Sequence, residues 1–501
     1  MAELSRRHLV VSGLAGAGAS LLPAAINEAN AATFTRYNLA SANGQVMLKK
    51  YAQAVKLMMA LPPSNPLSWT FQWYTHAVPS NTTKAAQISS IFGPNPSPNK
   101  TLATAMWNTC QAHFNQADEP YFLPWHRMYV CYFEDIIRTV LKDPKFTLPY
   151  WNYTSPAGYP VPKEFRMQND PLWGPLFRPN RNPTSNAGQP IFSAGGSASD
   201  LSPGPAMAQG QYLPSGVVQG FNQTLDGGLH GNVHVFTGNG QGMGSIPFAA
   251  NDPIFWMHHC NIDRIWVSWN AAGHTNPNTP AWLNKVFVFA GPDGKGVKVV
   301  VKDYTNTRKC DYGYDRLIGT TNLIARDSDA PSAAPAAAAA PVTVAKTQTG
   351  PVALSGAPVR VNVPTVAARP AAGTQSDSPL SSSLSVLPEN KRIYLVINDF
   401  KASVQPETLF RVYLDLPDNQ PSDPLNSHYV GSFNFFAAVP HGEDHEHGDM
   451  ARTLSFDITD VVADLNASGK LKAEHAVTII PAKTPYADSK PVIANISFVE
   501  Q

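Results

Sequence analysis

Six histidines fall into two groups of three along the chain, and this division constrains the possible folds more than any other feature. The first group is His76, His113 and His126, and the second is His230, His234 and His259. His230 and His234 stand four residues apart, so a helix would place both imidazoles on one face. The fold must then bring a third imidazole to this pair from a separate segment.

The segment that begins at Asp252 is predicted to supply this third imidazole. Asp252 is a favourable N-cap, and Pro253 suits the first helical position, where its missing N–H costs nothing. The helix would carry the neighbouring His258 and His259 one to two turns from its start. Consecutive helical residues point about 100° apart, so only one of the two is expected to join the pair.

The residue types in the two groups favour copper. Neither group contains Asp or Glu, and the sequence has no His-Glu-x-x-His motif of a zinc protease. All-imidazole sites suit copper, which also binds most tightly among the first-row divalent ions. Two copper ions that face each other, each with three histidines, would leave positions open for dioxygen. A zinc-binding structural protein is the alternative, which metal analysis would distinguish.

At these residues the chain resembles the tyrosinase and polyphenol oxidase family, the type-3 copper proteins that include molluscan hemocyanins. The second-copper pattern of that family matches His230, His234 and His259, with Asp-Pro-Ile-Phe before His259 and Asn-x-Asp-Arg after it. The first-copper pattern matches Phe122 to Tyr129, which contains His126. The resemblance covers most of the chain and implies two copper ions bound by the six histidines.

Two first-copper histidines match the family less closely. His113 precedes His126 by a longer spacing than in many members, and we interpret Asp118-Glu119-Pro120 as a loop insertion. The aromatic segment that ends in His76 resembles the stretch around the first ligand of the family, and a surface histidine is the alternative. Cys110 is the candidate for a thioether bond to a copper-binding histidine. An ordinary buried cysteine is the alternative that we favour.

The resemblance also implies roles near the second copper. Asp226 occupies the place of an acidic residue that orders a water and helps to deprotonate monophenols. Gly231 follows His230, at a position where efficient monophenol hydroxylators often have Asn.

Four further residues are placed around substrate access and the copper ligands. Ile246 stands where plant catechol oxidases often have Phe, and its smaller side chain leaves more room for a phenol ring. Phe255, one turn before His259, is predicted to stack within the site or to pack in the core. Val235 is placed beside the site, and His258 is predicted to support the ligands from behind or to belong to the core.

The expected function is that of a tyrosinase, which hydroxylates monophenols to o-diphenols and oxidises these to o-quinones. The alternatives are a catechol oxidase without appreciable hydroxylation and a hemocyanin-like oxygen carrier. Phenolic molecules and dioxygen are the expected partners, and the oligomeric state is left open. The formal net charge of +1, with no basic tract beyond the N-terminus, argues against nucleic acid or an anionic membrane as the main partner.

The N-terminus is predicted to be an export signal. Arg6 and Arg7 fit the twin-arginine pattern, an apolar stretch follows, and Ala29 to Ala31 offers small residues for cleavage. Residues 1–31 are therefore interpreted as a signal peptide that directs a periplasmic or secreted protein, without stable membrane insertion after cleavage. An uncleaved membrane anchor is the alternative.

Three regions should follow the signal. Residues 32–326 are predicted to form a mainly α catalytic domain, a helix bundle around the binuclear copper site that closes with a strand near residues 296–302 and with Tyr312 to Tyr314. Residues 327–385, rich in Ala and Pro, are predicted to be an extended linker. Residues 386–501 contain short apolar runs typical of an antiparallel β-sandwich.

The β-sandwich resembles the C-terminal domain that covers the active site in latent plant enzymes, so it is predicted to act as a lid. Its segment His441 to Asp449 could hold copper during loading, although a solvated acidic loop is the preferred interpretation. The four cysteines are too few and too scattered to predict a disulfide framework. Arg36 is expected to pack near Tyr312 to Tyr314.

Overall fold

The computed structural model of the chain describes residues 32–111, 120–319, 340–347, 350–364, 378–418, 420, 423–440 and 452–501. The predicted signal peptide, His113 and the segment His441 to Asp449 lie outside these ranges. Within them, every helix is too short or too polar to span a lipid bilayer.

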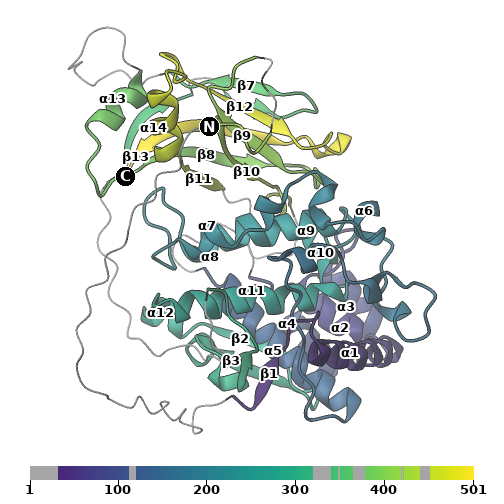
Figure 1. The fold of residues 1–501 in the computed structure, drawn as a ribbon. Helices are drawn as coiled ribbons and strands as arrows, with labels where there is room; N and C mark the ends of the chain where they lie inside the picture. The colour runs from purple at the N-terminus through teal and green to yellow at the C-terminus, as the bar shows by residue number, and fades with distance from the viewer. Residues whose placement is uncertain are drawn as a thin grey trace, which may run out of the picture. The chain divides into compact units, whose positions relative to one another are not determined.

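Helices dominate the first part of the chain, as predicted (Figure 1). The helices are α1 (Ala42–Ala60), α2 (Trp69–His76), α3 (Lys84–Phe92), α4 (Pro98–Met106), α5 (Phe122–Leu141), α6 (Pro183–Asn186), α7 (Gly204–Met207), α8 (Phe221–Leu225), the π-helix η7 (Asp226–His230), α9 (Gly231–Thr237), α10 (Ile246–Ala249), α11 (Ile254–Ala271) and α12 (Pro280–Leu283). Two small sheets complete this part, one from β1 (Phe34–Arg36) and β4 (Tyr312–Tyr314), the other from β2 (Val286–Ala290) and β3 (Gly296–Val300).

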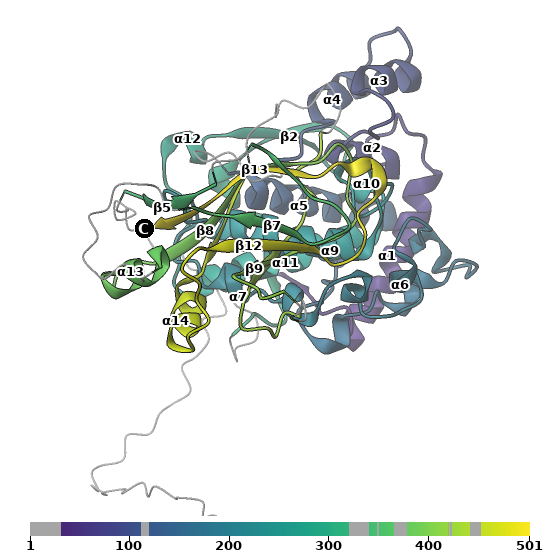
Figure 2. The ribbon, with the colours of Figure 1, turned by 90° about the horizontal axis from the view of Figure 1, so that it is seen from above.

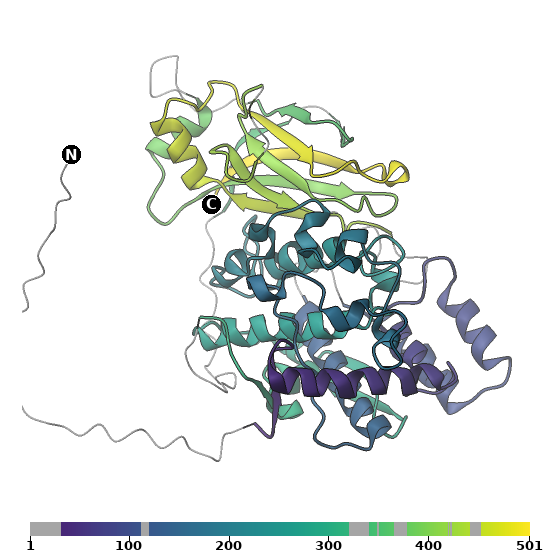
Figure 3. The same ribbon diagram turned by 45° about the vertical axis from the view of Figure 1, so that its right-hand side comes forward.

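The helices α5 and α11 pack against each other at the centre of this part, and α1 packs along α5 (Figure 3). Helix α5 buries apolar residues at helical spacing, among them Tyr129, Phe133 and Ile137. Helix α11 begins within two residues of the predicted start, and the backbone N–H of Ile254 donates to Asp252 Oδ1 over 3.1 Å. The N-cap of α11 is Pro253, one residue later than predicted, and the buried carboxylate of Asp252 just before it pairs with Arg181 at 2.6 Å.

The start and the end of the helical part meet at a buried charged cluster. Strands β1 and β4 pair in parallel, which brings the Arg36 guanidinium to 3.6 Å from the centre of the Tyr312 ring. Arg36 also pairs with Glu134 on α5 at 3.0 Å and with Asp263 on α11 at 3.4 Å. The expectation that Arg36 packs against the closing strand is therefore confirmed.

A disulfide joins Cys131 on α5 to Cys310, 179 residues later in the sequence. The sequence analysis expected no disulfide framework, and for this pair the expectation is wrong. The two cysteines come together only because the segment after β3 folds back onto α5, a contact that sequence spacing does not reveal. Cys110 and Cys260 are buried and take part in no disulfide among the described residues.

Residues 342–501, hereafter the β domain, contain two antiparallel sheets, which confirms the predicted sandwich. One sheet has the strand order β10 (Tyr429–Phe433), β9 (Phe410–Leu414), β12 (Ala476–Pro481) and β7 (Val359–Asn362), as Figure 2 shows for β9, β12 and β7. The other has the order β11 (Thr453–Asp457), β8 (Ile393–Lys401), β13 (Val492–Glu500) and β5 (Val342–Lys346), with β6 (Val352–Ala353) also paired to β13. Helices α13 (Pro379–Ser385) and α14 (Thr459–Ala467) accompany the sheets.

Strands β5, β6 and β7 lie inside the segment 327–385 that was predicted to be an extended linker, so this part of the linker prediction is wrong. Their partners are β12 and β13, more than a hundred residues later in the chain. Val361 and Ala345 are buried in the core of the β domain. Local composition underestimates such strands, because distant strands supply most of the apolar contacts that stabilise them.

Candidate metal centre

Five helices deliver histidines to one buried centre. His76 ends α2, His126 lies on α5, and His230 and His234 come from η7 and α9. The pair His258 and His259 comes from α11. The short π-helix η7 contains a break at Gly228, with φ −91° and ψ −107°, just before His230. π-helical turns inside α-helices occur often at functional sites.

In the first group, His76 and His126 lie together with Cys110. The carbonyl of Ile246 lies 3.1 Å from His76 Nδ1, and that of Phe122 lies 2.8 Å from His126 Nδ1. These carbonyls orient both rings by their Nδ1 atoms, which leaves the Nε2 atoms for a metal. Cys110 Sγ lies 3.7 Å from His126 Nε2.

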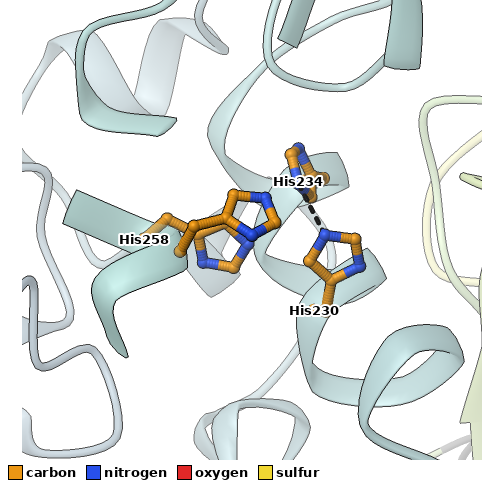
Figure 4. Close-up of side chains that lie close together, drawn as sticks. His230, His234 and His258 are labelled. Atoms are coloured by element: carbon orange, nitrogen blue, oxygen red, sulfur yellow. Dashed lines mark hydrogen bonds between the residues drawn. The ribbon is translucent and has the colours of Figure 1, made fainter. Parts of the chain in front are cut away.

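In the second group, His230 Nε2 and His234 Nε2 lie 3.0 Å apart (Figure 4). The carbonyl of Asp226 lies 3.2 Å from His230 Nδ1, and that of Met243 lies 2.7 Å from His234 Nδ1. The i, i+4 spacing therefore brings both rings to one point, as the sequence predicts. Carbonyls behind the rings fix which nitrogen faces the point of convergence.

Both His258 and His259 are buried in this second group, whereas the sequence analysis expected only one of them to enter it. The stacked rings of His230 and His258 (Figure 4) have centroids 5.2 Å apart. The Tyr153 hydroxyl lies 2.8 Å from His258 Nδ1. The ring of His259 instead stacks on His126 at 4.2 Å, with an interplanar angle of 7°. The angular separation on α11 thus sends His258 toward His230 and His259 toward the first group.

The polar atoms at this centre fit a metal. Among the described residues, neither ring nitrogen of His259 has a hydrogen-bond partner. The same holds for Nε2 of His258. Buried polar atoms without a partner are costly, and metal ions would supply the missing partners. Burial, followed by the neighbouring histidines, lowers the pKa of His126, His234, His258 and His259 well below the ordinary value. Burial thus favours the neutral form of these four imidazoles, which is the form that binds metals.

Asp226 and Phe255 flank the histidines. Asp226 Oδ1 lies 3.0 Å from His230 Nδ1, so its carboxylate contacts the nitrogen that faces away from His234. A carboxylate there orients the ring and makes it a stronger metal ligand. The ring of Phe255 lies with its centroid 4.2 Å from that of His259 and 5.0 Å from that of His76. Phe255 thus contacts both groups.

The remaining predicted site residues are buried around the same centre. Ile246 begins α10 and holds His76 through its carbonyl. Val235 follows His234 on α9, and its carbonyl accepts a hydrogen bond of 2.8 Å from Asn182. Gly231 lies directly under Asn434 of the β domain.

The sequence analysis did not find Phe436, which reaches the centre from the β domain. Its ring stacks on His234 with centroids 4.0 Å apart and planes inclined by 13°, and its edge contact to His230 measures 5.6 Å. Phe436 and Leu409 pack in the apolar core of the helical part, whereas most of the β domain has its own core. The nearby motif Gly431 to Asn434 was the only sequence signal for this contact.

The segment that carries the described histidines matches a known family. Residues 66–272 match the common central domain of tyrosinase. The chain therefore contains a central domain of the tyrosinase family. Residues 341–501, almost the same range as the β domain, match a domain of unknown function (DUF7868).

Members of this family align with much of the chain. A tyrosinase from Hahella is 33% identical over 291 residues, which are 53% of this chain and 60% of that protein, so the match spans less than two thirds of that relative. A chloroplastic polyphenol oxidase from Malus domestica is 27% identical over 488 residues, 88% of this chain and 74% of that protein. The structure of latent apple tyrosinase shares the fold, with a TM-score of 0.58, 23% identity and coverage of 93% of this chain and 97% of that one.

Proposed function

We propose that the chain is a latent phenol oxidase with two copper ions. It would oxidise o-diphenols to o-quinones and hydroxylate monophenols to o-diphenols, with dioxygen as the oxidant. The central domain of the tyrosinase family and the two facing histidine groups support this function. A buried site without charged ligands suits small neutral phenols.

His76, His126 and the predicted His113 would hold one copper, and His230, His234 and His259 the other. The bound copper pair would supply dioxygen binding and electron transfer. The chain itself positions the phenol, excludes water and keeps the imidazoles neutral. Asp226 is proposed to order the water that takes the phenolic proton, and Ile246 leaves space for the ring above the second copper.

Latency rests on one observation, the ring of Phe436 stacked on His234. A planar aromatic ring against a histidine of the second group occupies the space that a phenol ring would need. The amide of Gln405 donates to the carbonyl of Phe436 over 2.8 Å, which holds this residue in place. The β domain is therefore proposed to act as a lid that fills the substrate position.

The test is to load the full-length protein with copper and to cut it between residues 320 and 339, ahead of β5. Removal of the β domain should raise catechol oxidation strongly and leave the copper content at two per chain. Monophenol and catechol should be assayed separately, because a catechol oxidase would act only on the second.

The His259→Ala variant, cut in the same way, is the matched control and should stay inactive. Unchanged catechol turnover after separation of the fragments would contradict the lid. Dioxygen binding without quinone formation in the separated catalytic fragment would indicate a carrier instead of an enzyme.

A further inference from the structure

One contact between the helical part and the β domain involves glycines next to His230. Gly227 and Gly228 of η7 and Gly231 of α9 flank His230 in the sequence. Asn434 of the β domain contacts Gly227 and Gly231. A Cβ atom built on Gly231 would lie 2.7 Å from both Asn434 Nδ2 and Asn434 Oδ1. Real Cβ atoms essentially never make such short contacts, so a side chain at residue 231 and the present position of Asn434 exclude each other.

Asn434 cannot move aside without losing its hydrogen bonds. Its Nδ2 donates to the carbonyl of Gly227 and to Asn232 Oδ1, both over 2.9 Å. Its Oδ1 accepts from the backbone N–H of Phe436, again over 2.9 Å. The residue is 3% exposed, so its donors and acceptor would find little water if they moved. These bonds link the position of Asn434 directly to that of Phe436.

We infer that Gly231 is the docking socket of the lid, by which we mean the position where Asn434 fits only because residue 231 has no side chain. This missing side chain would set the latency of the chain. This inference rests on the proposed function and deepens it. Any side chain at residue 231 would lift Asn434, and with it Phe436, away from His234. With the lid undocked, residue 231 would still have room for a side chain, because the three atoms nearest to a Cβ built on Gly231 all belong to Asn434.

One position would then control two properties. Residue 231 follows the proposed copper ligand His230 in sequence, at the position that the family resemblance relates to monophenol hydroxylation. A side chain there would also prevent docking of the β domain.

The experiment measures lid docking without catalysis, by hydrogen exchange of peptides from residues 429–440 in the full-length, copper-loaded protein. Gly231→Ala should speed exchange there at least about tenfold, which corresponds to about 1.4 kcal/mol of lost docking. Gly210→Ala is the matched control, because a Cβ at Gly210 meets nothing within 4 Å. Its exchange should equal that of the wild type.

Two variants of Asn434 test whether the steric clash between residues 231 and 434 causes the loss of docking. Asn434→Ala removes the atoms that would clash, so the double variant Gly231→Ala with Asn434→Ala should exchange more slowly than Gly231→Ala alone. Asn434→Gln adds a methylene and leaves the copper-binding helices unchanged, so it should open the lid more than Asn434→Ala and keep the proposal testable if Gly231→Ala folds poorly.

Activity provides the second readout, as the ratio of catechol oxidation after and before removal of the β domain. This ratio should fall toward one in Gly231→Ala and stay high in Gly210→Ala. Wild-type exchange in Gly231→Ala, or no relief in the double variant, would overturn the socket. Absence of catechol oxidation in every cut protein would refute the proposed function, while the exchange data would still decide on the socket.

Discussion

The ring of Phe436 lies nearly parallel to the imidazole of His234, with centroids 4.0 Å apart, although 202 positions separate the two residues in the sequence. Phe436 is 2% exposed and packs in the core of the helical part. The β domain thus contributes a buried aromatic side chain to the candidate metal centre.

The variant Phe436→Ala should weaken docking of the β domain, because truncation of a buried Phe typically costs about 3–5 kcal/mol. Basal catechol oxidation of the uncut protein should rise at least about tenfold, since part of that loss falls on the docked state. Tyr486→Ala is a suitable control, because Tyr486 is an exposed aromatic residue of the same domain. Equal basal rates in both variants would show that Phe436 does not limit access.

The pair His258 and His259 can be separated by metal analysis. His259→Ala should reduce bound copper from two toward one per chain and abolish oxidation, because two imidazoles hold copper weakly. His258→Ala should retain two coppers. The reverse pattern would assign the ligand to His258, whose Nδ1 already has the Tyr153 hydroxyl as a partner.

Asp263 should be the most pH-sensitive support of the helical part. Burial raises its pKa, but Arg127 at 2.6 Å and Arg36 outweigh burial and hold the pKa below the ordinary value. Asp263→Asn leaves both guanidinium groups undercompensated and should cost about 3–5 kcal/mol of unfolding free energy at neutral pH. Urea unfolding would measure the loss, with Asp293→Asn as the exposed control.

The sign of the pH dependence follows from the lowered pKa. The stabilisation by Asp263 is complete above the unfolded pKa of about 3.9 and is lost as the pH falls through the lower folded pKa. The stability difference between wild type and Asp263→Asn should therefore stay constant from about pH 5 to 7 and shrink below about pH 4. A difference that grows on acidification would contradict this assignment.

Export is proposed to depend on Arg6 and Arg7. Replacement of both by Lys should leave copper-loaded protein in the cytoplasm, because the twin-arginine machinery recognises the arginine pair. Cell fractionation followed by immunoblotting would measure the distribution. Unchanged export of the variant would refute this route.

The sequence predicted the histidines well where helical spacing controls them. The four-residue spacing of His230 and His234 and the start of α11 just after Asp252 depend on short distances along the chain, so local rules suffice. Spacing alone does not separate His258 from His259, because both side chains lie in the same buried group, and His259 as the ligand stays a prediction. His113 lies outside the described residues, and its role stays a prediction.

Long-range contacts limited the remaining predictions. Cys131 and Cys310 carry no local signal that they meet. The alternation of Val359 and Val361 around polar residues was a weak indication of β7, which the surrounding Ala and Pro obscured. The contacts of Asn434 and Phe436 with the centre depend on how two domains meet, and no periodicity within either domain encodes that.

The pairing of β5, β6 and β7 with β12 and β13 gives a cut in this chain two different outcomes. A cut between residues 320 and 339 leaves every described strand of the β domain on the released fragment. A cut between residues 365 and 377 instead leaves β5 to β7 on the catalytic fragment, still hydrogen-bonded to β12 and β13. The second product is a split protein whose halves complement each other through shared sheets, so a nick there would free neither fragment.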